Sequence, residues 1–392
     1  MRQFGSREML PPLCGRDRES ERQSSILSTI DGQTSVGIGI VGCGTISATH
    51  AGALQALTSA RLAACCDVIP ERAGKFAREF GISNNHVHTS LKSFLSDPDV
   101  GAVSVCTPSG THAQIAIEAL LAGKPTIVEK PMDVNVDACD ALIAVQRRSG
   151  LPLGVISQHR FDAASIAARD LVESNALGRL VLIEAQVKWH RAQEYYDSGD
   201  WRGTWALDGG GALMNQGVHT VDLMRWLCGP VKSIYAVSRT AAHERIEVED
   251  VVCATLTFES GAIGNLVAST AAYPGFPASL SLHGDSGSLI ISGDVLQTVA
   301  TKAPVGVTGG GHAASHAMQV AQGGTKSAES HKTEAVVEET VWGDAHRAQL
   351  AEFIQAVKER RSPAVDGVSG RAAVELVCAV YESARTGKLV TL

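Results

Sequence analysis

Val36-Gly37-Ile38-Gly39-Ile40-Val41-Gly42-Cys43-Gly44-Thr45-Ile46-Ser47 is the stretch that decides the fold. Its first six residues are apolar or glycine, as in a buried parallel strand. The turn that follows has the spacing GxGxxS. Gly42 permits a tight turn, Gly44 lets the backbone approach a pyrophosphate, and the next helix presents its N-terminus to the phosphates. Thr45 and Ile46 belong to the same turn, so the stretch predicts a dinucleotide-binding strand–turn–helix unit.

A second strand supports this prediction. The segment 61–67 is apolar and ends in Asp67, which lies 25 positions after Gly42. An acid at this place in a Rossmann fold binds the adenosine ribose hydroxyls, and its charge repels a 2′-phosphate. Asp67 therefore favours NAD over NADP as cofactor. The alternative is a solvated acid at a strand end.

Strands and helices then alternate up to about residue 155. This alternation is typical of a doubly wound parallel sheet, and we expect a Rossmann domain over residues 35–155. Further strands are predicted at 100–106, 125–128 and 153–157, and helices at 47–57, 71–80, 91–95, 112–121 and 134–149.

Polar residues follow two of these strands, at the edge of the sheet where dinucleotides bind. Thr107, Pro108 and His112 come after the third strand, and Glu129 and Lys130 after the fourth. We predict that all five contact the cofactor. The Lys130 ammonium could also polarise a substrate hydroxyl or exchange a proton with it. The alternative is a surface ion pair with Glu129.

After residue 155 the alternation stops, and residues 156–392 are expected to form an α/β substrate-binding and oligomerisation domain with a large, mainly antiparallel open sheet. The last helices, at 346–359 and 369–386, could pack back on the Rossmann domain. Predicted strands lie at 181–189, 231–239, 251–258, 262–271, 278–283 and 288–291. A further hairpin, 295–302 with 334–342, would enclose a loop at 303–330.

Aromatic residues and arginines are concentrated early in this second part. Four of the ten Trp and Tyr residues lie between Tyr195 and Trp205. Such a concentration suits either a carbohydrate pocket or a dimer interface. The residues predicted to line a substrate pocket are Arg160, Lys188, Trp189, Tyr196 and Arg202.

The stretch 209–222, Gly-Gly-Gly-Ala-Leu-Met-Asn-Gln-Gly-Val-His-Thr-Val-Asp, carries the strongest chemical signal of this part. On a regular helix Asn215, His219 and Asp222 would share one polar face. The glycines would let a substrate approach the backbone. His219 could then act as an acid or base, with Asn215 orienting it or the substrate. The alternative is a buried, hydrogen-bonded histidine in an ordinary helix.

Composition excludes several classes. The chain has 392 residues, 44% hydrophobic and 19% charged, with a net charge of −7 and no basic cluster, so we expect no nucleic-acid partner and no membrane partner. The nine cysteines contain no CxxC pair, which favours a reduced cytoplasmic protein without a metal site. Residues 1–34 carry five basic and five acidic side chains without apolar periodicity, and we predict a disordered tail.

The motifs taken together resemble the glucose–fructose oxidoreductase / inositol dehydrogenase / MocA (Gfo/Idh/MocA) family of NAD(P)-dependent sugar oxidoreductases. The resemblance runs from residue 36 to the end and rests on 42–46, 107–112, Glu129-Lys130-Pro131 and the 209–222 stretch. It implies a catalytic pair formed by Lys130 and His219. Many members have Asp where this chain has Asn215, which leaves open whether Lys130 or His219 takes the hydroxyl proton.

The resulting expectation is an NAD-dependent dehydrogenase acting on a ring secondary hydroxyl of a sugar, cyclitol or nucleotide sugar. The resemblance also implies a homodimer or homotetramer. Two alternatives remain at this stage. One is an NAD-dependent glycosidase that oxidises its substrate transiently, and the other is a non-catalytic NAD-binding protein.

Overall fold

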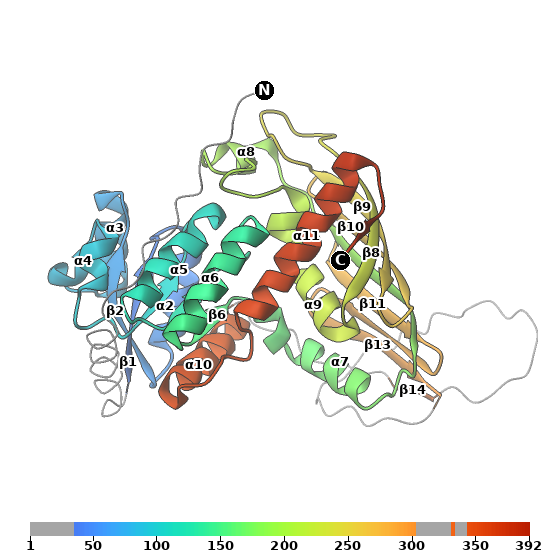
Figure 1. Ribbon diagram of the computed structural model, residues 1–392, viewed down its shortest axis with the longest axis horizontal. Coiled ribbons are helices and arrows are strands. Elements are labelled where there is room, and N and C mark those ends of the chain that lie inside the picture. The colour runs from blue at the N-terminus through green and yellow to red at the C-terminus, as the bar shows by residue number, and fades with distance from the viewer. Residues whose placement is uncertain (1–34, 303–330, 334–342) are drawn as a thin grey trace, which may run out of the picture.

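The computed structural model describes residues 35–302, 331–333 and 343–392. It contains a six-stranded sheet of order β3-β2-β1-β4-β5-β6 and a nine-stranded sheet of order β14-β13-β12-β11-β7-β10-β9-β8-β15. Figure 1 shows the two sheets at opposite ends of the molecule with helices between them. The predicted fold class, a Rossmann sheet followed by a mainly antiparallel one, is confirmed.

Every strand pair in the six-stranded sheet is parallel. The strand order reverses between β1 and β4, and in such sheets the crevice at the reversal is where ligands bind. The strands are β1 (Val36–Val41), β2 (Ala60–Cys66), β3 (Val87–His88), β4 (Ala102–Val105), β5 (Thr126–Val128) and β6 (Leu153–Val155).

Helices cover both faces of this sheet because its strands are apolar on both sides. One face packs against α4 (Leu91–Leu95), α5 (His112–Leu121) and α6 (Val136–Ser149). The other packs against α2 (Thr45–Gln55), α3 (Pro70–Phe80) and α10 (Asp344–Glu359). Helix α10 comes after all but the last strand of the second sheet in sequence, so the C-terminal part of the chain completes the core of the first sheet.

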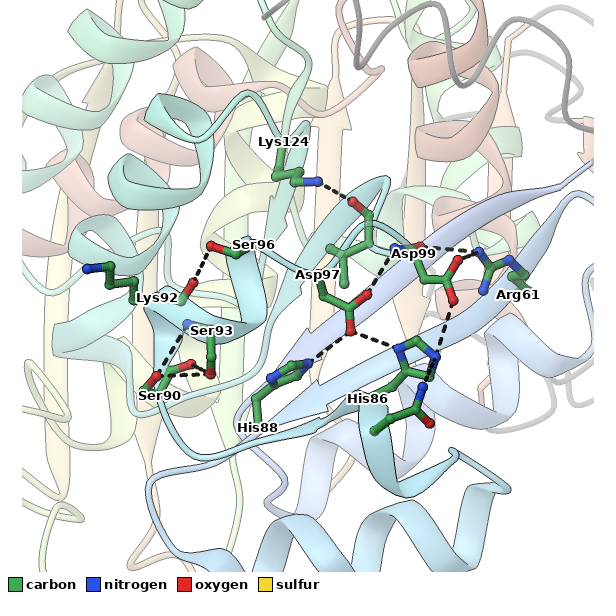
Figure 2. Close-up of polar contacts among 12 residues, drawn as sticks. Arg61, His86, His88, Ser90, Lys92, Ser93, Ser96, Asp97, Asp99 and Lys124 are labelled. Atoms are coloured by element: carbon green, nitrogen blue, oxygen red, sulfur yellow. Dashed lines mark hydrogen bonds and ion pairs between the residues drawn. The ribbon is translucent and has the colours of Figure 1, made fainter.

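A polar cluster fastens the outer strand β3 to the loop after α4 (Figure 2). One Asp97 oxygen accepts from His86 Nδ1 at 2.8 Å and from His88 Nε2 at 2.9 Å. The other accepts the Asp99 N–H, and Asp99 pairs with Arg61 at 2.9 Å. Because β3 has only two residues, these side-chain bonds supplement a short ladder.

The second sheet comprises β7 (Leu180–Lys188), β8 (Val231–Arg239), β9 (Val251–Phe258), β10 (Ile263–Ser269), β11 (Ser279–Gly284), β12 (Gly287–Ser292), β13 (Val295–Thr301), β14 (His331–Thr333) and β15 (Val390–Thr391). Strand β7, predicted from the alternation over 181–189, lies in the middle of the sheet, antiparallel to β11 and parallel to β10. From Ile183 onward its residues alternate between buried and partly exposed, because one face of the sheet is covered by helices and the other is open.

The covered face of the nine-stranded sheet packs against α7 (Ala163–Glu173), α9 (Val218–Cys228) and α11 (Gly367–Thr386), as Figure 1 shows. Helix α11 also packs on α6, so it joins the two halves. The opposite face exposes Tyr235, Val237 and Ile263, which are 47%, 51% and 57% exposed.

Several predictions fall outside the described residues: the tail 1–34, the loop 303–330 and the strand 334–342. Strand β14, at 331–333, pairs with β13 just before that last segment. The division of the chain near residue 155 stays a prediction. Among the described residues, no helix combines the length and the apolar character that crossing a bilayer requires.

Candidate active site

The turn between β1 and α2 has the form that a dinucleotide needs. Gly42 has φ +89°, and a Cβ there would lie 2.7 Å from the Cys106 carbonyl oxygen. A Cβ at Gly44 would meet no atom within 4 Å, so the turn is open on the side that a pyrophosphate would approach. No side chain caps α2, whose first turn contains Thr45 and Ile46, and its free N–H groups can bind phosphate. These residues fit NAD.

Asp67 lies beside this turn. Its carboxylate accepts the Cys43 N–H and the Ile69 N–H, both at 2.9 Å. The two bonds hold the carboxylate at the end of β2, next to the glycines. This is the position from which an acid can reach the ribose hydroxyls of a bound NAD.

His112 has a structural environment. Its ring nitrogens lie 2.8 Å from the Pro131 and Thr107 carbonyl oxygens, and the residue is buried. It therefore ties the loop after β4, with Thr107 and Pro108, to the loop after β5. This argues for a role in holding the two loops rather than in touching the cofactor.

Glu129 is at the centre of a buried polar cluster. Its Oε1 receives a hydrogen bond from His50 Nε2 at 2.8 Å, and His346 Nε2 lies 3.9 Å away. Its Oε2 accepts the Lys130 N–H at 3.0 Å. Burial favours the neutral acid, but the hydrogen bond and charge of His50 outweigh it and lower the pKa of Glu129 to about 2. Sequence reasoning gave His50 no chemical role, yet it fixes the residue before Lys130.

Lys130 extends from the end of β5 toward the second half of the molecule. Its Nζ donates to the Asn215 carbonyl oxygen at 2.9 Å. Burial lowers the pKa of Lys130, the carboxylates of Glu129 and Asp208 oppose this, and the Arg202 charge adds to it. The alternative of a surface ion pair between the Lys130 ammonium and Glu129 is not found. The Glu129 carboxylate accepts instead from the Lys130 backbone N–H and from the His50 ring.

The 209–222 stretch is not the regular helix that its spacing predicts. Residues Ala212–Gly217 form a π-turn (η4), and α9 begins only at Val218. Asn215 and Asp222 consequently have different partners. Asn215 Nδ2 donates to Asp208 at 2.5 Å, whereas Asp222 forms a two-point salt bridge with Arg160 at 2.6 and 2.7 Å. His219 and Asp222 both lie in α9 and line one cavity, whereas Asn215 lies in the π-helical segment, where the rotation between residues differs from that of an α-helix.

The glycines before this turn serve protein packing. A Cβ at Gly211 would lie 1.7 Å from the Glu249 carbonyl oxygen, and one at Gly210 would lie 2.2 Å from the Tyr381 hydroxyl. Glu249 accepts the Gly211 and Leu213 N–H groups at 2.9 and 2.8 Å and so caps the turn. The predicted substrate approach at these glycines is therefore occupied by protein atoms.

His219 lies in the first turn of α9 and lines one small cavity together with Lys130. Among the described residues neither of its ring nitrogens has a hydrogen-bond partner, and its ring meets the His159 ring edge-on at 5.1 Å. Burial lowers the pKa of His219 well below its usual value, and the charges of Lys130, His159 and His346 add to this. This lowered pKa favours the neutral imidazole, whose ring nitrogens no described residue occupies.

Three other predicted residues have different surroundings. Arg160 is paired with Asp222 and lies over Trp226. Tyr196 is buried, with its hydroxyl 2.8 Å from Thr270 Oγ1, so no face is left for a substrate. Trp189 lines a separate open groove beside Arg191 and Phe276. Arg202, in contrast, is near Lys130 and Asp208.

Sequence reasoning missed Asp208, Tyr195 and Gln216 as site residues. Asp208 is buried, and burial raises its pKa although the Gly203 N–H and Asn215 favour its charge. The Tyr195 hydroxyl accepts from Arg202 at 2.7 Å and from Gln216 at 2.9 Å. The buried Gln216 Oε1 has no partner. The concentration of aromatics at 195–205 was the available signal.

Three groups of His, Asp and Glu among the described residues lie close enough to hold an ion, namely those around Glu129, Asp97 and Asp162. Hydrogen bonds within each group account for the proximity of its members. The absence of a metal stays a prediction.

Comparison with known proteins agrees with this geometry. Residues 36–157 match the oxidoreductase family model with an NAD-binding Rossmann fold, and residues 166–290 match the GFO/IDH/MocA C-terminal domain. The chain belongs to the Gfo/Idh/MocA family of NAD-binding oxidoreductases, and the predicted family and cofactor class are confirmed.

Three relatives illustrate its range. The WlbA dehydrogenase from Bordetella pertussis, crystallised with NADH and UDP-GlcNAcA, is 31% identical with a TM-score of 0.75, covering 91% of this chain and 99% of that one. The 1,5-anhydro-D-fructose reductase of Ensifer adhaerens is 28% identical over 89% of this chain and 96% of its own. Inositol 2-dehydrogenase 2 of Saccharopolyspora erythraea is 28% identical over 64% of this chain and 72% of its own.

Proposed function

We propose that this protein is an NAD-dependent dehydrogenase that oxidises a ring secondary hydroxyl of a sugar, cyclitol or nucleotide sugar. One observation carries the proposal. Lys130 comes from the Rossmann sheet and His219 from the helix that packs on the second sheet, and both line one cavity. The named relatives, which act on cyclitols and sugars or were crystallised with a nucleotide sugar, support the substrate class.

The two side chains have complementary states. The Lys130 ammonium can donate a hydrogen bond to the substrate oxygen while it remains bonded to Asn215. Neutral His219 can take the hydroxyl proton at a ring nitrogen that no described residue occupies. Bound NAD supplies the hydride acceptor. Lys130 is fixed by two hydrogen bonds, from its backbone N–H to Glu129 and from its Nζ to the Asn215 carbonyl oxygen, which spares the reaction the cost of orienting it.

The test is a panel of sugars, cyclitols and nucleotide sugars with purified protein and NAD, followed by NADH absorbance. We expect net NADH formation with at least one ring alcohol. Glycoside cleavage without net NADH would support the glycosidase alternative. Binding of NAD with no turnover of any substrate would support the non-catalytic alternative.

We also propose a homo-oligomer formed through the open face of the nine-stranded sheet. Tyr235 and Val237 on β8 and Ile263 on β10 project from that face, and exposed apolar side chains in one area mark interaction sites. Light scattering should report a dimer or tetramer, and Val237→Asp should shift it toward monomer. The eight cysteines of the described residues are free thiols, which supports the proposed cytoplasmic location.

A further inference from the structure

The groove that Trp189 lines also contains the side chain of Arg191, which has no anionic partner among the described residues. The Arg191 guanidinium lies between two aromatic rings, 5.2 Å from the Trp189 centroid and 5.3 Å from the Tyr195 centroid. Its buried Nε has no hydrogen-bond partner. The Arg191 backbone is fixed by Thr270 and His243. Among the described residues no carboxylate forms an ion pair with it, so this side chain is held in place with its donors free.

The surroundings of Arg191 suit an anionic group followed by a planar one. The groove has a volume of about 370 Å³, within the range of small-molecule sites. Phe276 lines it and is 52% exposed, and the Lys188 ammonium lies 5.9 Å from the Phe276 ring. Arg191 and Lys188 can bind phosphate through charge-assisted hydrogen bonds, and the Trp189 and Phe276 rings can stack on a base. These two cations lie together in a chain whose net charge is −7.

The groove is connected to the reaction site through Tyr195. Arg191 and Arg202 lie on this ring, at 5.3 and 4.3 Å. The Tyr195 hydroxyl accepts a hydrogen bond from the Gln216 side chain. Gln216 follows Asn215, and the Asn215 carbonyl oxygen accepts a hydrogen bond from Lys130 Nζ. The unpartnered Gln216 Oε1 offers one more acceptor on this route. These contacts place Tyr195 between the groups around Arg191 and those around Lys130, and a nucleoside-diphosphate sugar is longer than a sugar that carries a single phosphate.

We infer that the substrate is a nucleoside-diphosphate sugar whose diphosphate binds Arg191 and Lys188, whose base lies against Trp189 and Phe276, and whose sugar ring reaches Lys130 and His219. The inference rests on the proposed function for the sugar end only. The groove itself binds the nucleotide part whether or not hydride is transferred.

Calorimetric titration with UDP, dTDP and GDP tests the groove. The protein is first saturated with NADH so that the nucleotide cannot enter the cofactor site. We expect one of them to bind with a dissociation constant below about 1 mM. Arg191→Gln should weaken it by roughly 10–100-fold, since a charge-assisted hydrogen bond is lost, and Phe276→Ala should weaken it as well. Arg179→Gln is the matched control, because Arg179 is 75% exposed at the other end of β7.

The outcomes separate the two proposals. Weaker nucleotide binding in Arg191→Gln, with NADH affinity and melting temperature unchanged, supports the groove. Failure of all three nucleotides to bind while NADH binds overturns it and leaves the dehydrogenase proposal intact. Binding of a sugar 1-phosphate as tightly as the nucleotide overturns the base site. Nucleotide binding without turnover of any nucleotide or neutral sugar would count against the dehydrogenase instead.

Discussion

Lys124 and Lys130 lie at opposite ends of the same strand, β5, and their differences separate structure from chemistry. Both are largely buried, and each ammonium donates to one backbone carbonyl, Val100 for Lys124 at 2.5 Å and Asn215 for Lys130 at 2.9 Å. Burial lowers the pKa of both. Beyond Lys124 lies the polar cluster of Figure 2, in which Asp97 is bonded on both oxygens. Beyond Lys130 lie His219 and Gln216, which have unpaired atoms.

This comparison shows how a buried polar group can be interpreted. A polar cluster whose donors and acceptors are all paired contributes to stability and leaves nothing for a ligand. A cluster with fixed but unpaired atoms carries a cost that a ligand can offset. The carboxyl end of β5 has the second character and its amino end the first, in agreement with the general placement of ligands in parallel sheets.

The largest effect is expected from exchanging each lysine for methionine. Lys130→Met should lower kcat by roughly 10²–10⁴-fold, because a positioned proton-handling group is lost, with little change in NADH affinity. Lys124→Met should leave kcat unchanged and lower the melting temperature, since Val100 O loses its donor. Steady-state kinetics and thermal melts of both variants measure this. Wild-type turnover in Lys130→Met would contradict the proposed chemical role of Lys130, and the two ends of β5 would then not differ in function.

A second variant tests the paired cluster. Asp97→Asn should cost about 1–3 kcal/mol of unfolding free energy and leave kcat unchanged, because the carboxylate that accepts from the half-buried His86 and His88 rings is lost. Burial favours neutral Asp97, but the bonds from His86, His88 and the Asp99 N–H outweigh it and lower its pKa. This stability is therefore complete above about pH 4, the unfolded value, and lost as the pH falls below it. Denaturant titrations at several pH values should show the two proteins converging in acid.

A smaller effect concerns cofactor choice. Asp67→Ala should weaken NAD binding by about tenfold, because the carboxylate beside the ribose hydroxyls is lost. It should also reduce the difference in affinity between NAD and NADP, because the repulsion of a 2′-phosphate is lost as well. Asp99→Ala, in the paired cluster, is the control and should leave both affinities unchanged. Fluorescence titration with NADH and NADPH decides. A wild-type preference for NADPH would contradict the role of Asp67.

The smallest effect is a shift in pH dependence. Burial lowers the pKa of His159, but its hydrogen bonds to Asp162 and Asp294 outweigh this and raise it to about 9, so it is charged at neutral pH. That charge, together with that of Lys130, helps to keep His219 neutral. His159→Gln should raise the pKa of His219 and move the acid limb of kcat/KM upward by about one pH unit. An unchanged profile would show that the two rings are not coupled.

The sequence by itself determined the elements whose signal is local. The apolar run 36–41, the Gly42–Gly44 turn and the acid at residue 67 each depend on a few neighbouring residues, so the Rossmann half and its cofactor class followed from spacing. Lys130 and His219 were candidates from their positions in the sequence, the family resemblance implies that they form a catalytic pair, and both line one cavity in the structure. Their roles stay predictions.

Only the tertiary structure decided which polar groups remain unpaired. Asn215, His219 and Asp222 have a helical spacing, but Asp208 and Arg160 bind the first and the last, and neither partner is signalled by that spacing. Within the part of the chain that the structure describes, no carboxylate forms an ion pair with Arg191, which its sequence neighbours do not reveal. Hydrogen-bond pairing depends on contacts between residues distant in sequence, whereas strand, turn and helix patterns depend on near neighbours, and this is why the fold could be predicted more fully than the site.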